Sequence, residues 1–473
     1  MNSIKRYWLL FISLFCILLF GPSFSTFFTN DDFYFLNISR ANNVSEFLEF
    51  FDPVNIYKGQ SMYRPLTTQV FYFLGKLILQ MNPFYMHITV FASFIFLVYL
   101  VYLLAFKISK NKDISILTAF LYATSATHFG HLFYFATFQE IGAAIFAFLS
   151  CILFIDYLDN KNKKLYFLSI IAFILGLLSK ETAVVVPVIF LLIYFFIKKF
   201  DIRFIIPFAL ILGTYLFVRL RFYGVVTSDT YVWDFSERIL NTIVWYAAWS
   251  LNLSESFIDF IGPGFNVNPN LFKYWRNEAV LILSTFVALA ISLSILFIKD
   301  VKHILRKNIN VYIFSLAIFI LGIGPVVFLP IHKFSYYLTI SLFGVSLAIS
   351  YILNRNKTYA KVIVLSLWVL GSYFNISYSL DTSWITRGAE ISSRVKNYFD
   401  KVNLSSEVSY VYFTDTARDV DLPWSPTEVV YNAISKEDFF EVYYPNKFII
   451  TSTIDHQMHH NLIQVESRQF LGY

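Results

Sequence analysis

Apolar runs close to the length of a membrane-spanning helix recur along this chain of 473 residues. A helix crosses the hydrocarbon core of a bilayer with about 20 mostly apolar residues, and somewhat shorter runs also suffice. Eleven runs fit this pattern, at residues 7–24, 83–106, 114–129, 138–157, 165–178, 182–197, 204–220, 280–298, 311–329, 334–353 and 362–379. The sequence therefore predicts an all-α polytopic membrane domain with about eleven transmembrane helices.

The composition excludes the water-soluble classes. Charged residues make up 14% of the chain, whereas a soluble domain carries about 25%. The 55 Phe and 32 Tyr residues suit lipid-facing helices with aromatic belts at both interfaces. The net charge of +6 comes from Lys and Arg scattered near the ends of the runs, a pattern typical of membrane topology and not of nucleic-acid binding. Cys16 and Cys151 lie inside apolar runs, so no structural disulfide is expected.

Every second connection between the runs is rich in Lys and Arg, as cytoplasmic loops are. These connections hold Lys5 and Arg6; Lys107, Lys110 and Lys112; Lys161, Lys163 and Lys164; Lys198, Lys199 and Arg203; Lys299, Lys302, Arg306 and Lys307; and Arg355, Lys357 and Lys361. We therefore expect a plasma-membrane protein with a cytoplasmic N-terminus and an outer C-terminus. The first 24 residues also fit a signal peptide, but they lack a clear small-x-small cleavage site, so we expect them to stay as the first span.

Two long outer loops, residues 25–82 and 221–279, complete the predicted membrane domain of residues 1–380. Each loop contains apolar residues at helical spacing, at 65–81 and 236–251, which predicts helices lying in the interface.

Beyond residue 380 the chain becomes polar. Residues 381–473 predict a small α/β domain outside the membrane, with an amphipathic helix at 383–402 and strands at 407–413 and 447–451.

Ionisable residues gather at the outer ends of the spans, which are themselves nearly free of charge. Transporters usually place such residues near the bilayer midplane, where the cargo crosses. The outer set consists of Asp31, Asp32, Arg64, His128, His131, Glu140, Lys180, Glu181, His332 and Lys333. This distribution indicates a site at the outer interface and not a conduction path.

Such a set suits a substrate with a membrane-embedded tail and a sugar-phosphate head. A carboxylate can accept the proton of an attacking hydroxyl, and Arg64, Lys180 or Lys333 can hold the departing lipid phosphate. The chain has no Gly-rich nucleotide loop, as expected for a lipid-linked donor. We interpret the aromatic stretch 129–138 as an interface belt, with sugar stacking as the alternative.

Four motifs carry a family resemblance: Asn30–Asp31–Asp32 after the first span, YRPLT at 63–67, His128-x-x-His131 followed by Glu140, and LSKET at 178–182. They resemble membrane glycosyltransferases of the GT-C fold, which include protein O-mannosyltransferases and the aminoarabinose transferase of lipid A. The nearest likeness is to O-mannosyltransferases with transmembrane and tetratricopeptide repeats. The chain departs from them in lacking the repeats and in having Gln139–Glu140 where an Arg-containing stretch is common. The likeness covers roughly residues 1–350.

The resemblance implies a role for each residue. Asp31 would be the general base, and Asp32 would orient the acceptor or a cation. Arg64, Lys180, His332 and Lys333 would bind the donor phosphate, while Tyr63, His128, His131, Glu140 and Glu181 would bind substrate.

Each motif also has a purely structural interpretation. An Asp pair favours turns and helix caps, Arg64 can snorkel at the interface, and Lys180–Glu181 can be a turn closed by an ion pair. His128 and His131 have ligand-like spacing, so a divalent cation with Glu140 or an Asp as third ligand stays open as a cofactor.

The sequence therefore predicts a membrane glycosyltransferase. Its partners would be a polyprenyl-phosphate sugar donor, a hydroxyl acceptor on a protein, glycan or lipid, and membrane lipids, with no nucleic acid. One displacement with inversion is the simplest mechanism. The alternatives are a transporter or flippase of lipid-linked glycans, which needs a polar path to the cytoplasmic side, and a polymerase or ligase of surface polysaccharide.

Overall fold

The structure, a computed structural model, describes residues 7–54, 62–225, 230–262, 264, 266–402, 410–419, 422–445, 448–450 and 462–472. Most of these residues are helical. The α-helices are α2 (Trp8–Phe20), α3 (Asp31–Ile38), α4 (Val44–Glu49), α5 (Phe71–Leu79), α6 (Pro83–Ser109), α7 (Lys112–Ala123), α8 (Phe129–Phe133), α9 (Phe138–Asn160), α10 (Lys163–Leu177), α11 (Val186–Leu192), α12 (Ile206–Val218), α13 (Arg238–Trp249), α14 (Asn270–Tyr274), α15 (Arg276–His303), α16 (Ile309–Ile323), α17 (Ser341–Arg355), α18 (Thr358–Thr382), α19 (Trp384–Val402), α20 (Pro426–Ile434) and α21 (Glu437–Tyr443).

A helix lies in each of the eleven predicted ranges. Within the described residues, six helical segments are long and apolar enough to cross a membrane: Trp8–Ser25, Pro83–Ser109, Phe135–Asn160, Ile202–Tyr223, Arg276–Ile323 and Thr358–Thr382. The fifth segment contains two of the predicted spans, α15 and α16. The remaining predicted spans form shorter helices, so the chain is a mostly helical membrane protein and the count of eleven stays a prediction.

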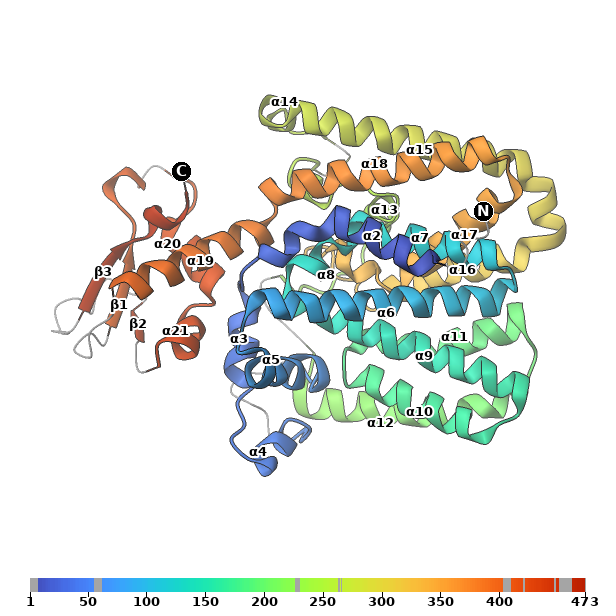
Figure 1. The fold of residues 1–473 in the computed structure, drawn as a ribbon, viewed down its shortest axis with the longest axis horizontal. Coiled ribbons are helices and arrows are strands. Elements are labelled where there is room, and N and C mark those ends of the chain that lie inside the picture. The colour runs from blue at the N-terminus through green and yellow to red at the C-terminus, as the bar shows by residue number, and fades with distance from the viewer. Residues whose placement is uncertain are drawn as a thin grey trace.

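The long helices run side by side, and the small C-terminal domain lies at one end of this bundle (Figure 1). The start of α2 lies at the opposite end, as do the α6–α7, α9–α10 and α17–α18 connections. These connections carry the clustered Lys and Arg residues. We call the end next to the C-terminal domain the domain end.

The predicted interfacial helix at 65–81 forms a π-helical turn, Leu66–Val70, that continues into α5. Its polar residues Thr68 and Gln69 are buried, whereas Leu77 and Ile78 are exposed. The apolar side thus faces outward, as suits contact with lipid, and the polar side faces the protein. The second predicted interfacial helix corresponds to α13, where Leu240 is exposed and Trp249 is buried.

The C-terminal domain contains a parallel sheet in the order β2-β1-β3, formed by β2 (Phe448–Ile450), β1 (Tyr410–Thr414) and β3 (Leu462–Glu466). The predicted helix at 383–402 is α19. The two predicted strands coincide with β1 and β2, although residues 407–409, 447 and 451 lie outside the described part of the chain. The sequence did not predict β3, α20 or α21.

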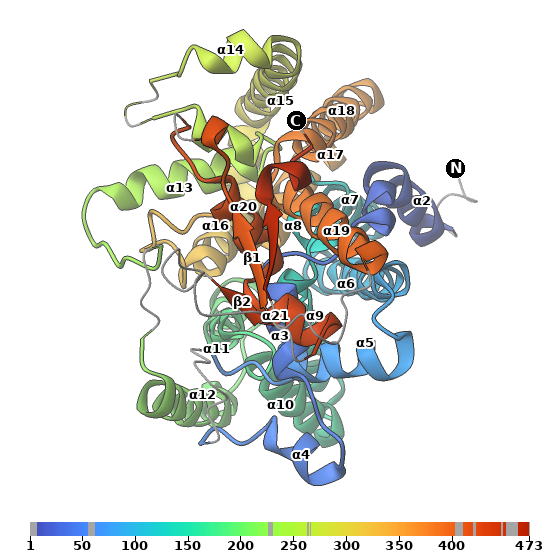
Figure 2. The ribbon, with the colours of Figure 1, turned by 90° about the vertical axis from the view of Figure 1, so that its left-hand side faces the viewer.

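The C-terminal domain packs against the 25–82 loop at α3. The N–H of Asn30 donates to the carbonyl of Ala433 at 2.8 Å, and the amide of Asn37 donates to Asp438 at 2.9 Å. A Cβ on Gly388 of α19 would lie 2.5 Å from the Thr29 hydroxyl oxygen, so only glycine allows this approach. Figure 2 views this end of the molecule, with α21 and β1 in front of α3. Packing of the domain therefore helps to fix the start of α3.

Candidate active site

A cavity of about 230 Å³ opens at the domain end of the bundle. Four predicted site residues line it: Asp31, Arg64, Lys180 and His332. They come from α3, the 62–65 segment, the turn after α10 and the segment before α17. Tyr34, Phe35, Met62, Thr68, Tyr134, Ala136, Thr137, Gln139, Tyr231, Tyr336 and Tyr337 complete the lining. The cavity therefore brings one carboxylate and two cations into a largely aromatic enclosure.

Close packing at Gly142 of α9 holds the two cationic segments against each other. A Cβ at this position would lie 2.6 Å from the Thr67 methyl group, so a larger residue would push the 62–70 segment away. The Thr67 hydroxyl also donates to the carbonyl of Ser179 at 2.6 Å. These contacts fix the positions of Arg64 and Lys180 beside α9.

Asp31 and Asp32 form the first turn of α3, where carboxylates are favoured by the helix dipole. Asp31 is exposed to the cavity. The enclosure raises the pKa of Asp31 by desolvation, while a hydrogen bond from Tyr134 and the charge of Arg64 act in the opposite direction. This aspartate is the carboxylate that a bound substrate can reach.

Asp32 is fully buried beneath the cavity. Its oxygens accept hydrogen bonds from the Tyr72 hydroxyl at 2.6 Å and from the Thr29 N–H at 3.0 Å. Burial raises the pKa of Asp32 to about 8, against these two hydrogen bonds. Asp32 does not line the cavity, and its contacts position the turn that carries Asp31.

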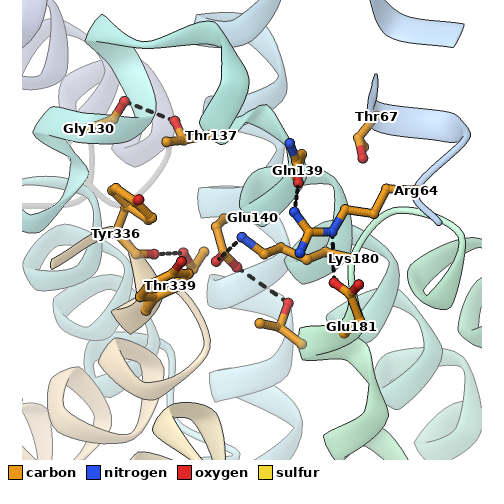
Figure 3. Close-up of polar contacts among 12 residues, drawn as sticks. Arg64, Thr67, Gly130, Thr137, Gln139, Glu140, Lys180, Glu181, Tyr336 and Thr339 are labelled. Atoms are coloured by element: carbon orange, nitrogen blue, oxygen red, sulfur yellow. Dashed lines mark hydrogen bonds and ion pairs between the residues drawn. The ribbon is translucent and has the colours of Figure 1, made fainter. Parts of the chain in front are cut away.

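Arg64 is held by two partners at the cavity wall (Figure 3). Its Nε donates to Glu181 at 2.7 Å, and its Nη1 donates to the side chain of Gln139. Burial acts to lower the pKa of Arg64, but the charge and hydrogen bond of Glu181, together with Tyr231 and Tyr337, raise the pKa above its ordinary value. The same carboxylate accepts from Arg219 Nε at 3.3 Å. The snorkelling interpretation does not describe this buried, bridged guanidinium.

Lys180 forms a buried ion pair with Glu140 at 2.8 Å (Figure 3). The Thr182 hydroxyl donates to the other oxygen of Glu140 at 3.3 Å, and the Lys180 ammonium lies 4.9 Å from the centre of the Tyr337 ring. Burial lowers the pKa of Lys180, with Glu140 opposing the shift. Lys180 thus reaches the cavity while Glu140 lies behind it, and the predicted ion pair joins Lys180 to Glu140 and not to Glu181.

His332 borders the cavity within a group of aromatic rings. Its ring centre lies 3.9 Å from that of Tyr231, and its Nε2 lies 2.9 Å from the hydroxyl of Tyr337. Burial, together with the charges of Lys180 and Arg64, lowers the pKa of His332 to about 4. The imidazole is therefore neutral at physiological pH and can exchange hydrogen bonds without adding charge.

His128 and His131 lie in the core and not on the cavity. Their Nδ1 atoms are 3.1 Å apart, and their Nε2 atoms lie 2.9 and 3.0 Å from the carbonyls of Tyr122 and Tyr336. Burial lowers the pKa of His131 well below its ordinary value. With all four ring nitrogens engaged inside the protein, the pair ties α7 to the segment before α17.

Tyr63 and Lys333 also lie away from the cavity. The Tyr63 hydroxyl donates to the carbonyl of Phe51 at 2.6 Å, within the 25–82 loop. Lys333 donates to Asn241 at 3.1 Å and lines a second, larger hollow. Lys333 is therefore not positioned to bind a phosphate in this cavity, contrary to its predicted role.

The sequence did not predict the tyrosines of the cavity wall or Gln139. The aromatic stretch 129–138 is buried almost throughout, so its interpretation as a belt at the lipid interface is wrong. Tyr134 of this stretch accepts a hydrogen bond from the Asp31 N–H at 3.2 Å. These tyrosines could not be recognised in the sequence, because Tyr and Phe are frequent throughout the chain.

Among the described residues, no three His, Cys, Asp or Glu side chains group as metal ligands. His128 and His131 have no third such partner there, since Glu140 pairs with Lys180. Comparisons with known proteins add no assignment: no family model matches the chain, and no curated protein matches it.

Proposed function

We propose that this chain is a membrane glycosyltransferase that uses a polyprenyl-phosphate sugar as donor and a hydroxyl group as acceptor. The observation that carries the proposal is the shared cavity of Asp31, Arg64 and Lys180 at the domain end of the bundle. Enzymes that transfer a group from a phosphate need a base for the acceptor and cations for the leaving phosphate. The sequence resemblance to GT-C transferases supports the same assignment.

In this mechanism the acceptor oxygen attacks the anomeric carbon of the donor sugar from the side of Asp31. The bond between that carbon and the phosphate oxygen breaks, and the polyprenyl phosphate leaves with the electron pair. The acceptor proton passes to the Asp31 carboxylate. Arg64 and Lys180 stabilise the charge of the departing phosphate, and the sugar is transferred with inversion.

The protein environment suits each of these roles. Desolvation raises the pKa of Asp31, which makes it a stronger base than an exposed carboxylate. Arg64 offers a guanidinium whose Nε and Nη1 are already bound, so little side-chain entropy is lost when it meets a phosphate. Neutral His332 can donate to or accept from a sugar hydroxyl.

The proposed topology has eleven spans, with the N-terminus cytoplasmic and the cavity and C-terminal domain outside. The exposed apolar face of α5, which includes Leu77 and Ile78, would lie in the outer leaflet. The segment next to α5 carries Arg64, so the phosphate site would sit at the depth of the lipid headgroups.

The test is transfer by the purified full chain in nanodiscs supplied with labelled polyprenyl-phosphate hexoses and pentoses and with cell-envelope extract. Label should appear in a protein, glycan or lipid product, and Asp31→Asn should abolish it. Movement of labelled donor between leaflets without any product would instead identify a flippase. A product that forms equally with Asp31→Asn would contradict the proposed mechanism.

A further inference from the structure

A second hollow of about 740 Å³ lies between the C-terminal domain, α19 and the second outer loop. We call it the domain groove. Its size falls within the range of about 300–1,000 Å³ that is typical of small-molecule sites. Residues of three parts of the chain form it, among them Glu255 from the loop, Trp384 and Arg387 from α19, and Trp424 from the C-terminal domain. The groove therefore exists only when the domain is packed on the bundle.

The groove lies next to the cavity that holds Asp31. Asn30 lines the groove and Asp31 lines the cavity. Between them stands a wall of aromatic rings, in which Trp384 meets Tyr134 edge-on with their centres 5.2 Å apart. Phe334 on the groove side stacks on Tyr336 on the cavity side at 5.0 Å. A ligand in the groove thus lies one ring layer from the proposed base.

The chemistry of the two hollows differs. The cavity carries two cations and one carboxylate, which suits an anionic phosphate. The groove carries three cations against four carboxylates, namely Lys333, Arg387 and Arg394 against Glu255, Asp259, Asp381 and Glu390. Such a mixed lining offers hydrogen-bond donors and acceptors to a ligand without favouring either sign of charge.

Two tryptophans give the groove a more specific character. Trp384 is 38% exposed and Trp424 is 37% exposed, and both line the groove. A broad ring beside hydrogen-bonding side chains fits a sugar, whose C–H face packs on the ring while its hydroxyls bond at the edges. No described residue of β1, β2 or β3 lines the groove, so it offers no strand edge to an extended peptide.

We infer that the domain groove binds the acceptor, and that this acceptor is a neutral oligosaccharide. The inference rests on the proposed glycosyl transfer. Trp384 and Trp424 would stack on its sugar units, and its terminal hydroxyl would meet Asp31 at the edge of the aromatic wall beside Asn30. The C-terminal domain would then select the acceptor while the membrane part selects the donor.

The test is binding of neutral oligosaccharides to the full chain in nanodiscs, without donor. The probes are short chains of glucose, galactose, mannose and N-acetylglucosamine, with uronate-containing oligosaccharides and Ser/Thr-rich peptides alongside. At least one neutral probe should bind, and Trp384→Ala and Trp424→Ala should each weaken it by about tenfold. Trp233→Ala is the matched control, because Trp233 is also exposed but does not line the groove.

Asp31→Asn should still bind the probe while it loses transfer, since Asp31 does not line the groove. Loss of transfer in Trp424→Ala with normal thermal unfolding would add support. The inference is overturned if no neutral probe binds, if both groove variants bind as the wild type does, or if peptides bind instead. These results leave the donor chemistry untouched, whereas full transfer by Asp31→Asn would overturn the proposed mechanism alone.

Discussion

Arg64 and Glu181 are 117 residues apart in sequence, yet the Nε of Arg64 lies 2.7 Å from a Glu181 carboxylate oxygen. The other oxygen of Glu181 meets Arg219 at 3.3 Å, so one carboxylate orients two guanidinium groups. The remaining face of Arg64 lines the cavity. This bridge explains how a cation can stay fixed beside a hollow that is otherwise rich in aromatic rings.

Replacing Arg64 by Lys should weaken donor binding. Lys carries one ammonium and cannot bond Glu181 and Gln139 in the same planar arrangement while it faces a phosphate. We expect a loss of about tenfold in affinity for a polyprenyl phosphate, measured by titration in nanodiscs. Arg238→Lys is the control, because Arg238 is exposed and does not line the cavity. Equal affinity in Arg64→Lys and wild type would contradict the phosphate role.

Replacing each of the two aspartates by asparagine should affect a different property of the protein. Asp31→Asn should lower single-turnover transfer by about a hundredfold to ten-thousandfold, as removal of a general base does, with little change in unfolding temperature. Asp32→Asn should instead lose about 1–3 kcal/mol of stability, because its amide cannot accept from both Tyr72 and Thr29. Transfer rates and thermal unfolding in detergent measure the two effects. A reversed pattern would exchange the two roles.

Stability should depend on pH through Asp32. The pKa of this residue is raised to about 8 in the folded protein, whereas an unfolded chain releases the proton near pH 4. The folded state therefore binds more protons between these values, and its stabilisation is lost as the pH rises toward 8. The unfolding temperature of wild type minus that of Asp32→Asn should decrease from pH 5 to pH 8. A difference that stays constant over this range would contradict the raised pKa.

The pair of Lys180 and Glu140 should behave as a buried ion pair. Glu140→Gln leaves the Lys180 charge without its partner, and we expect a loss of about 3–5 kcal/mol in stability. The double variant Glu140→Leu with Lys180→Met should recover most of that loss while donor binding stays weak. The unfolding temperature tests the recovery of stability, and the affinity for phosphate, measured on the same samples, tests the weak donor binding. Recovery of donor binding in the double variant would exclude Lys180 from the phosphate site.

The proposed orientation can be tested with single cysteines. Ser45 in the 25–82 loop and Lys163 at the start of α10 are both exposed, and the buried Cys16 and Cys151 would first be replaced by alanine. In intact cells an impermeant thiol reagent should label Ser45→Cys and leave Lys163→Cys unlabelled. In permeabilised cells both should react. Labelling of Lys163→Cys from outside would contradict the eleven-span model.

The sequence alone was sufficient to locate the long apolar helices of the membrane domain. Hydrophobic length and helical spacing are local properties, and a helix lies in every one of the eleven predicted ranges and in both predicted interfacial segments. The same local signals predicted α19 and the first two strands of the C-terminal domain. The strand β3 was not predicted, because its identity depends on pairing with β1, in which Tyr410 lies opposite the distant Leu462.

Only the tertiary structure decided which polar residues meet. The motifs and the gathering of charged residues at the span ends predicted Asp31, Arg64, Lys180 and His332, and these four share the cavity. They also predicted His128, His131 and Tyr63, whose partners prove to be carbonyl groups. Local sequence fixes which side of a helix a residue occupies, but the neighbour on that side comes from a distant segment. Asp31 and Asp32 show this best, because one adjacent carboxylate faces the cavity and the other is buried against Tyr72.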